Sequence, residues 1–439
     1  MNTLFKNVRI MQTKAPFEVL EGMDVLVKGD TIAQIGKEIV AQDAKVINAK
    51  GKTLMPGNVC SHHHYYSGLS RGMLVNAGPQ TDLIQILREW WWRLDRSLDE
   101  EACYYSSLIC SLDAIAAGTT SVVDHHASPN FIKGSLSTIK KGMEEVGLRG
   151  MTCYEVTDRN GGMSEVEAAV QENVDFATSG TSNMVKAMIG GHAPFTIPDE
   201  GLKLMSEACN TTGSGVHIHV GEGDYDQIQS HHRYGKDIAK RLESFDLLRE
   251  NSLLVHGVYL SEDEINTLNA HKCFLAHNPR SNMNNQIGYN NKIPMVDKLV
   301  VGTDGIGANM FEELKVAFFK HRDDKGPWWP NEFVEALNRG NQLIETYFDG
   351  NYGEVKEGYK ADLTLVDYKS PTPLVSDNAS GHFIWGMSSN SVHSVMINGE
   401  MVLENREFVG IDVDEIYNKA SEVAKRVWEK VDTLAPYNR

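Results

Sequence analysis

Three consecutive histidines, His62 to His64, follow a short apolar run that opens at Pro56-Gly57. On a β-strand, alternate side chains share a face, so His62 and His64 should point one way and His63 the other. Two imidazoles side by side at a strand end suit a metal ion. The alternative is an ordinary pair of histidines near a loop.

The same residue types recur after other short apolar runs. The chain has 16 histidines, and many stand with acidic residues at such positions: Asp124, His125, His126, His192, His217, His219, Glu222, His256, His277 and Asp304. In a barrel of parallel strands, the carboxyl ends of all strands meet at one face. We therefore expect these side chains to gather there, although they are far apart in the chain.

The elements that would position them are about eight strand-helix units. Continuous apolar runs fit strands that are buried on both faces of a parallel sheet, and eight such units are the content of a TIM (β/α)8 barrel. The runs are 57–60, 121–123, 151–154, 184–189, 216–220, 253–255, 273–276 and 299–301. An open doubly wound sheet is the second choice, because no glycine-rich dinucleotide fingerprint opens the first unit.

Both ends of the chain show a different pattern. β-Forming runs at 5–11, 22–28 and 31–35, and again at 362–366 and 393–397, predict strands, and Asn398-Gly399 predicts a hairpin turn. We expect a small β-sandwich domain from residues 1–55 plus 356–412 and a barrel over 56–355. A helix over 413–439 would follow, with a helical apolar stripe that indicates packing on the body or, as the second choice, a dimer contact.

The composition and net charge indicate which kinds of binding partner to expect. Hydrophobic residues make up 41% and charged residues 23%, and the formal net charge is −17. Such a surface repels phosphate backbones, so a nucleic-acid partner is not expected and a small-molecule substrate is. No apolar run approaches the length of a membrane span. Six cysteines without a C-x-x-C pair indicate free thiols. We expect a cytoplasmic protein that forms a homodimer or a higher homo-oligomer.

Taken in order, these motifs resemble the amidohydrolase superfamily, in particular its metal-dependent deaminase and chlorohydrolase branch. The resemblance covers nearly the whole chain and is closest to the SsnA-type aminohydrolases, whose substrate is poorly defined. It is carried by Pro56-Gly57, Gly68–Gly72, Gly118-Thr119-Thr120, His192-Ala193-Pro194, His217-Ile218-His219, His256-Gly257, His277-Asn278-Pro279, Ser281–Asn285, Thr303-Asp304-Gly305 and Gly358–Asp362.

The resemblance implies a role for each matching residue. The metal ligands would be His62, His64, His219 and Asp304, the catalytic groups Glu222, His256 and Asp304, and the substrate contacts His192, His256 and Arg71. Because His192 stands where a carboxylated lysine usually bridges two metals, and Lys186 lies too early on the strand, one divalent ion per chain is expected. Zinc is the first choice, and iron(II) also fits this ligand set.

The chemistry follows from these residue types. Three neutral imidazoles and one carboxylate leave a divalent ion with an open position, which supplies hydroxide near neutral pH. Asp304 can accept the proton of the water, and Glu222 can pass a proton to a ring nitrogen. We therefore expect deamination of a small purine-like heterocycle. The alternatives are hydrolysis of a cyclic amide or amidine, dechlorination at the same site, or a catalytically silent scaffold.

Several residues stay ambiguous. We expect a hydrogen bond from His217 to a ligand histidine and no site role for His63, and we assign no role to His125, His126 or His277. Glu155 could line the pocket. Trp90–Trp92 and Trp328-Trp329 fit either core packing or an aromatic wall for a flat ring, and Asn282, Asn284 and Asn285 fit either substrate contacts or turn formation.

Overall fold

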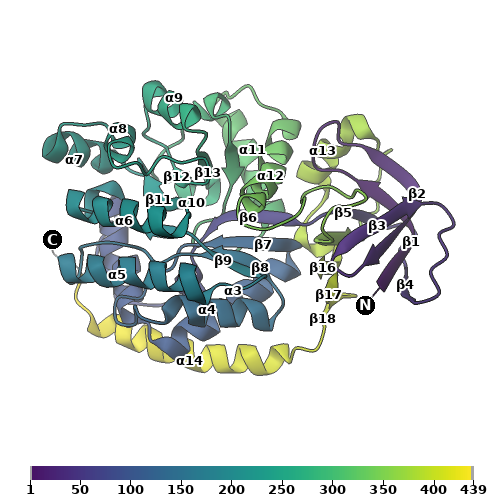
Figure 1. Cartoon of the computed structure of the whole chain (residues 1–439), viewed down its shortest axis with the longest axis horizontal. Helices are drawn as coiled ribbons and strands as arrows, with labels where there is room; N and C mark the ends of the chain where they lie inside the picture. Colours follow the sequence, from purple (N-terminus) through teal and green to yellow (C-terminus); the bar gives the residue numbers. More distant parts are fainter. Residues whose placement is uncertain (1, 437–439) are drawn as a thin grey trace.

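The computed structural model describes residues 2–436, in which parallel strands covered by helices adjoin a sheet built from both ends of the chain (Figure 1). The parallel strands form two hydrogen-bonded sheets. One has the order β6 (Asn58–His63), β7 (Thr119–Asp124), β8 (Arg149–Thr152) and β9 (Val185–Ala187). The other has the order β10 (Ile189–Gly191), β11 (Val216–Val220), β12 (Leu253–His256), β13 (Phe274–His277) and β14 (Leu299–Val301).

The predicted apolar runs fall on these strands. β11 and β14 have the predicted bounds, and every residue of both is buried. The fourth run differs, because it is broken at Met188 into β9, which pairs with β8, and β10, which pairs with β11. The backbone amide of Met188 donates instead to Thr152 at 3.2 Å. One predicted strand therefore belongs to two sheets and joins them.

A second junction lies between β14 and β6. The backbone amides of Thr303 and Asp304 donate to the carbonyl of His62 at 2.9 and 3.1 Å, and His63 and Asp304 form an isolated parallel bridge. This junction holds the residues after β14 against the histidines that end β6.

Helices follow most of the parallel strands and cover their outer faces (Figure 1). Their bounds are α3 (Glu100–Ala116), α4 (Ser135–Glu145), α5 (Met163–Asp175), α6 (Asp199–Thr212), α7 (Asp224–Tyr234), α8 (Ile238–Glu243), α9 (Glu262–Ala270), α10 (Pro279–Asn284), α11 (Met310–Asp323) and α12 (Pro330–Glu345). Between β6 and α3, the chain forms a mostly helical segment with α1 (Leu83–Ile86) and α2 (Trp92–Leu94).

The terminal strands form one sheet rather than two separate ones. Its strands are β1 (Asn2–Met11), β2 (Val19–Lys28), β3 (Thr31–Gly36), β4 (Ala44–Asn48), β5 (Thr53–Pro56), β15 (Leu363–Val366), β16 (Val392–Ile397), β17 (Glu400–Glu404) and β18 (Glu407–Phe408). The two ends of the chain meet where β5 pairs with β15. Strands from both ends of the chain therefore belong to one hydrogen-bonded sheet, and the two layers of a β-sandwich stay a prediction. The short α13 (Ala379–Gly381) precedes β16.

The C-terminal helix α14 (Val413–Thr433) runs along the body beside α3 (Figure 1). Its side chains Ala420, Val423, Val427 and Val431 are buried, as the helical stripe predicted. None of the helices in residues 2–436 has the length and apolarity that a bilayer crossing needs.

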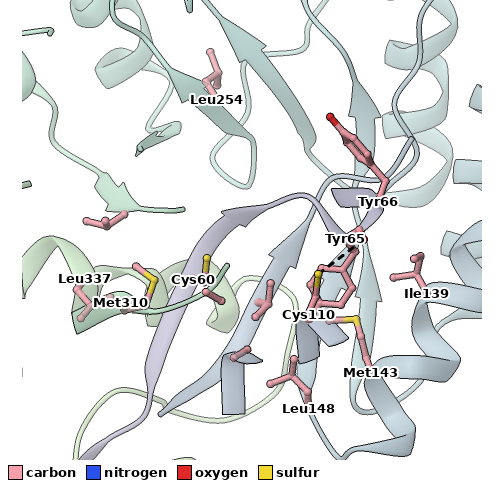
Figure 2. Close-up of a cluster of buried hydrophobic side chains, with 14 of the residues drawn as sticks. Cys60, Tyr65, Tyr66, Cys110, Ile139, Met143, Leu148, Leu254, Met310 and Leu337 are labelled. Carbon is pink, nitrogen blue, oxygen red and sulfur yellow. Dashed lines mark hydrogen bonds between the residues drawn. The ribbon is translucent and has the colours of Figure 1, made fainter. Parts of the chain in front are cut away.

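The core lies between the strands and their helices. Two adjacent tyrosines after β6 point in different directions. Tyr65 turns towards Cys110 in the core, and Tyr66 turns away from it (Figure 2). Tyr65 is fully buried, and Tyr66 lines the cavity described next.

Candidate metal centre and active site

The four predicted metal ligands come together at the carboxyl ends of the parallel strands. His62 is in β6 and His64 directly follows it, His219 is in β11, and Asp304 follows β14. Nε2 of His64 lies 2.9 Å and Nε2 of His62 lies 3.4 Å from Oδ1 of Asp304. Nε2 of His219 lies 3.2 Å from Nε2 of His64. The four side chains are buried, and their donor atoms point into one small volume.

Backbone carbonyls fix the tautomers of two of these histidines. Nδ1 of His64 lies 2.6 Å from the carbonyl oxygen of His125, and Nδ1 of His219 lies 2.6 Å from that of His192. A carbonyl only accepts, so in the neutral form of each ring Nδ1 carries the proton and Nε2 keeps its lone pair. A metal-binding imidazole needs this arrangement.

His62 is oriented by another histidine. Its Nδ1 lies 2.8 Å from Nε2 of His217, and Nδ1 of His217 lies 3.6 Å from Sγ of Cys153. If His62 donates to His217, which in turn donates to Cys153, Nε2 of His62 is left free for a ligand. His217 therefore lies where the expected hydrogen bond to a ligand histidine requires.

The backbone is unusual at two of these strand ends. His256 has φ +69° and Asp304 has φ +55°, in the left-handed region that residues other than glycine seldom adopt. Such conformations cost on the order of 1–3 kcal/mol and cluster at functional sites. At both positions the backbone turns sharply where the side chain enters the centre.

The donor set fits a metal ion. Ligand atoms of His62, His219, His256 and Asp304 all lie within 4.8 Å of one another, and those of His64, His125 and His219 form an overlapping group. Nε2 of His62 is buried and has no hydrogen-bond partner within residues 2–436. Imidazole nitrogens and one carboxylate are ligands that suit zinc and iron(II).

The electrostatics favour a cation at this point. Burial keeps the pKa of His62 and of His219 well below the ordinary value, so both rings are neutral. Burial also disfavours the charged form of His64, yet the hydrogen bond and charge of Asp304 raise its pKa to about 9. Burial opposes ionisation of Asp304, yet its close contacts with the His62 and His64 rings and the charge of His64 hold its pKa well below the usual range.

Glu222 lies beside this centre, three residues after His219. Its Oε2 is 3.7 Å from Nε2 of His256, and burial raises the pKa of the Glu222 carboxyl. A carboxyl whose neutral form is favoured can hold a proton near neutral pH and deliver it.

His256 is held by an amide. Its Nδ1 lies 2.9 Å from Oδ1 of Asn282, which accepts, so the proton of His256 is on Nδ1. Its Nε2 faces Glu222 and lies 3.8 Å from Oδ2 of Asp304. Oδ2 of Asp304 also accepts a hydrogen bond from Oγ of Ser281.

A cavity opens over these residues. The predicted site residues that line it are His64, His192, His219, Glu222, His256 and Asp304. It is also lined by Tyr66, Leu87, Trp91, Trp92, Asp95, Glu155, Arg159, Ser281, Asn284, Asn285, Gly305 and Ile306. His192 bonds through Nδ1 to Oγ1 of Thr196 at 2.7 Å.

Arg71 lies outside this cavity. Its side chain is 69% exposed and pairs with Asp113 on α3. The expectation that Arg71 contacts substrate therefore finds no support in the geometry. Its sequence motif forms the loop after β6, and that loop directs the guanidinium to the surface instead.

Of the aromatic and histidine residues without an assigned role, some line the cavity and others lie outside it. Trp91 and Trp92 line the cavity, whereas Trp329 is exposed and stacks under Arg322. His277 is buried against Tyr289, and its ring nitrogens have no hydrogen-bond partner within residues 2–436.

Two charged cavity residues were missed from the sequence. Asp95 directly follows α2 and begins a short 3-10 helix (Asp95–Ser97), and Arg159 follows β8 by several residues. The only sequence signal is that Arg159 stands four residues after Glu155, at the carboxyl end of a parallel strand. Asp95 carries no such signal.

Comparison with known proteins agrees with the site. The model of the amidohydrolase family matches residues 53–402, and the chain belongs to this family. The predicted resemblance and the hydrolase class are confirmed.

Two curated relatives are similar to this chain over most of its length. A 5-methylthioadenosine/S-adenosylhomocysteine deaminase of Caldanaerobacter subterraneus subsp. tengcongensis is 28% identical over 441 residues, covering 97% of this chain and 99% of the relative. A 5'-deoxyadenosine deaminase of Methanopyrus kandleri is 28% identical over 383 residues, covering 85% of this chain and 86% of the relative.

Solved structures share the fold. An adenosine deaminase from Xanthomonas campestris with bound zinc has a TM-score of 0.83 at 20% identity, over 98% of this chain and 99% of that one. An atrazine chlorohydrolase from Arthrobacter aurescens complexed with zinc has a TM-score of 0.83 at 19% identity, over 96% of this chain and all (100%) of that one.

Proposed function

We propose that this protein is a metal-dependent aminohydrolase that deaminates a small purine-like heterocycle. The observation that carries the proposal is the convergence of three imidazole Nε2 atoms and Oδ1 of Asp304 beside Glu222 in one cavity. The relatives named as deaminases of adenine nucleosides support the reaction type.

His62, His64, His219 and Asp304 would hold one divalent ion, with zinc as the first choice and iron(II) as the second. The zinc in the two structural neighbours supports this order. When bound, the ion supplies a Lewis acid that lowers the pKa of a coordinated water towards neutral.

The side chains divide the proton transfers between them. Oδ2 of Asp304 faces the cavity and can take the proton of the attacking water, while Oδ1 stays with the histidines. Glu222 delivers its proton to the ring nitrogen next to the attacked carbon. Asp304 then passes the proton of the water to the amine, which leaves as ammonia, and Glu222 regains a proton from the new hydroxyl group. Nε2 of His256 faces both carboxylates, and its lone pair can accept a hydrogen bond that orients the attacking water.

The architecture that we propose for residues 56–355 is a closed (β/α)8 barrel. The backbone contacts between β6 and the residues after β14, and the strand shared by β9 and β10, support closure. Residues 1–55 and 356–412 would form the small β domain. The predicted C-terminal helix over 413–439 corresponds to α14 (Val413–Thr433), and residues 437–439 lie outside the described part of the chain. We also propose that the protein is a homodimer or a higher homo-oligomer, whose mass light scattering would measure.

The test is release of ammonia from a panel of aminopurines, their nucleosides, aminopyrimidines and pterins, with chloro- and cyclic-amide analogues alongside. Deamination predicts stoichiometric ammonia and the corresponding oxo product by mass spectrometry. Release of chloride or of a ring-opened acid, without ammonia, would identify one of the alternative reactions of the same site. Turnover of no compound by metal-loaded protein would contradict the proposal.

A further inference from the structure

The cavity wall carries a charged cluster that the proposed mechanism does not use. Nη2 of Arg159 lies 2.7 Å from Oδ2 of Asp95 and 2.7 Å from Oε1 of Glu155. All three side chains are almost fully buried. Two carboxylates thus share one guanidinium, and burial raises the pKa of Asp95 to about 7.

Some polar atoms of the cluster have no hydrogen-bond partner in the described part of the chain. Nε and Nη1 of Arg159 and Oδ1 of Asp95 are buried, and none of them has a hydrogen-bond partner within residues 2–436. Buried polar atoms in native proteins are nearly always paired, so such atoms in a cavity wall indicate a ligand that pairs with them. The ring of Trp92 lies 4.9 Å from the guanidinium and supports it.

The unpartnered atoms of the cluster include a donor, Nη1 of Arg159, and an acceptor, Oδ1 of Asp95. Because Nη2 of Arg159 already contacts Oδ2 of Asp95, the free Nη1 and Oδ1 belong to the same joined pair. An –NH–C(=O)– edge matches this pair, since its carbonyl accepts and its N–H donates.

The cluster is also close to the metal donors. The ring of His192 lies 5.8 Å from the ring of His219 and 6.0 Å from that of Trp92, measured between centroids. The ring of His192 therefore lies between His219 of the metal centre and Trp92, the tryptophan that contacts Arg159. A group bound by Arg159 and Asp95 should belong to the ring system under attack rather than to an appended sugar.

We propose that Asp95 and Arg159 bind an –NH–C(=O)– edge of the substrate ring, with the N–H on Oδ1 of Asp95 and the carbonyl on Nη1 of Arg159. The inference rests on the proposed function and deepens it. The substrate class is an amino-substituted heterocycle with a ring amide, and both residues determine specificity.

Matched substrate pairs test this in the metal-loaded wild-type enzyme. Guanine carries the edge and 2-aminopurine lacks it, with the same exocyclic amine, and isocytosine and 2-aminopyrimidine form a second pair. We expect kcat/KM to favour the member with the edge by roughly 10- to 100-fold in each pair that is turned over, because a site built for hydrogen bonds rejects an analogue that lacks them.

Variants then assign the preference to the cluster. Asp95→Leu, which removes the acceptor at similar volume, and Arg159→Lys should each reduce the ratio within a pair towards one, through a larger loss on the member with the edge. Arg426→Lys, in the exposed pair of Arg426 with Asp99, is the matched control and should leave the ratio unchanged. Thermal melting and metal content show that each variant is folded and loaded, and the wild-type ratios decide the question where a variant fails to fold.

The outcomes separate the two proposals. Equal turnover within the pairs, or turnover confined to adenine and its nucleosides, overturns the amide-edge subsite and leaves the aminohydrolase function standing. If instead Asp95→Leu lowers turnover only of ribonucleosides and not of their 2',3'-dideoxy analogues, the cluster binds a sugar diol and the inference is wrong. Release of ammonia from no compound overturns the proposed function and the inference together.

Discussion

Oδ1 of Asp304 lies 2.9 Å from Nε2 of His64, a residue 240 positions earlier in the chain. The backbone amide of Asp304 also donates to the carbonyl of His62 at 3.1 Å. The same segment therefore joins the end of β14 to β6 and carries the carboxylate into the metal centre. A displacement of this segment would disturb the junction and the ligand set together, so metal binding and local folding are coupled.

Metal removal should abolish activity. Dialysis against a chelator removes the ion that we place between the histidines and Asp304, and added zinc or iron(II) should restore turnover. His219→Ala should lower the metal content measured by mass spectrometry, whereas His232→Ala on the exposed face of α7 should not. Full activity of the chelated protein would contradict the metal centre.

Glu222→Gln should separate chemistry from metal binding. The amide cannot deliver a proton, so we expect kcat to fall by roughly 10²- to 10⁴-fold, the usual contribution of a general acid-base group. Metal content should stay unchanged, because Glu222 is outside the ligand set. Glu207→Gln on the exposed side of α6 is the control. A variant with wild-type kcat would exclude Glu222 as the proton donor.

Asn282→Ala should lower kcat through His256. The substitution removes the acceptor that lies 2.9 Å from Nδ1 of His256, so the ring loses its fixed tautomer. We expect about a 10-fold or larger loss, in the range measured for residues that orient catalytic or metal-bound histidines. Asn282→Asp keeps an acceptor and should rescue part of the activity, which a purely structural role would not predict.

Asp226 should give stability a measurable pH dependence. It accepts from the amides of Gly221 at 2.8 Å and Phe195 at 3.2 Å, and thereby ties the loop of Glu222 to the loop of His192. Burial raises its pKa from 3.8 to about 7 in the folded state. The folded protein therefore binds the proton more tightly, and the resulting stability is lost as the pH rises from about 4 to 7.

Urea unfolding at pH 5, 6 and 7 measures this effect. The difference in unfolding free energy between wild type and Asp226→Asn should fall with rising pH, by up to about 1.4 kcal/mol per pH unit. Asp43→Asn on the surface should show no such slope. A difference that is constant across this range would mean that Asp226 does not titrate there.

Arg71→Ala tests the one predicted substrate contact that lies outside the cavity. Because the side chain is exposed and pairs with Asp113, we expect kcat/KM to stay within about 3-fold of wild type, as for most surface substitutions. A KM that rises 10-fold or more while kcat stays unchanged would restore the substrate role that the sequence motif suggested.

Much of this site could be predicted from the sequence because short-range patterns encode it. The alternation of side chains along a strand placed His62 and His64 on one face, and the apolar runs gave the bounds of β11 and β14. Polar residues directly after such runs, such as His219 with Glu222 and Asp304, indicated the face at which the strands end. These inferences need only the local period and the rule that parallel strands end at one face.

Tertiary structure alone decided the rest. The acceptors that fix the tautomers of His64 and His219 are backbone carbonyls, which carry no sequence signal. Asp95 and Arg159 are 64 positions apart and meet only through the paths of two loops, while the loop after β6 carries Arg71 to the surface. Side-chain type and period are local properties of a sequence, whereas loop paths depend on packing between distant segments, and only folding sets those contacts.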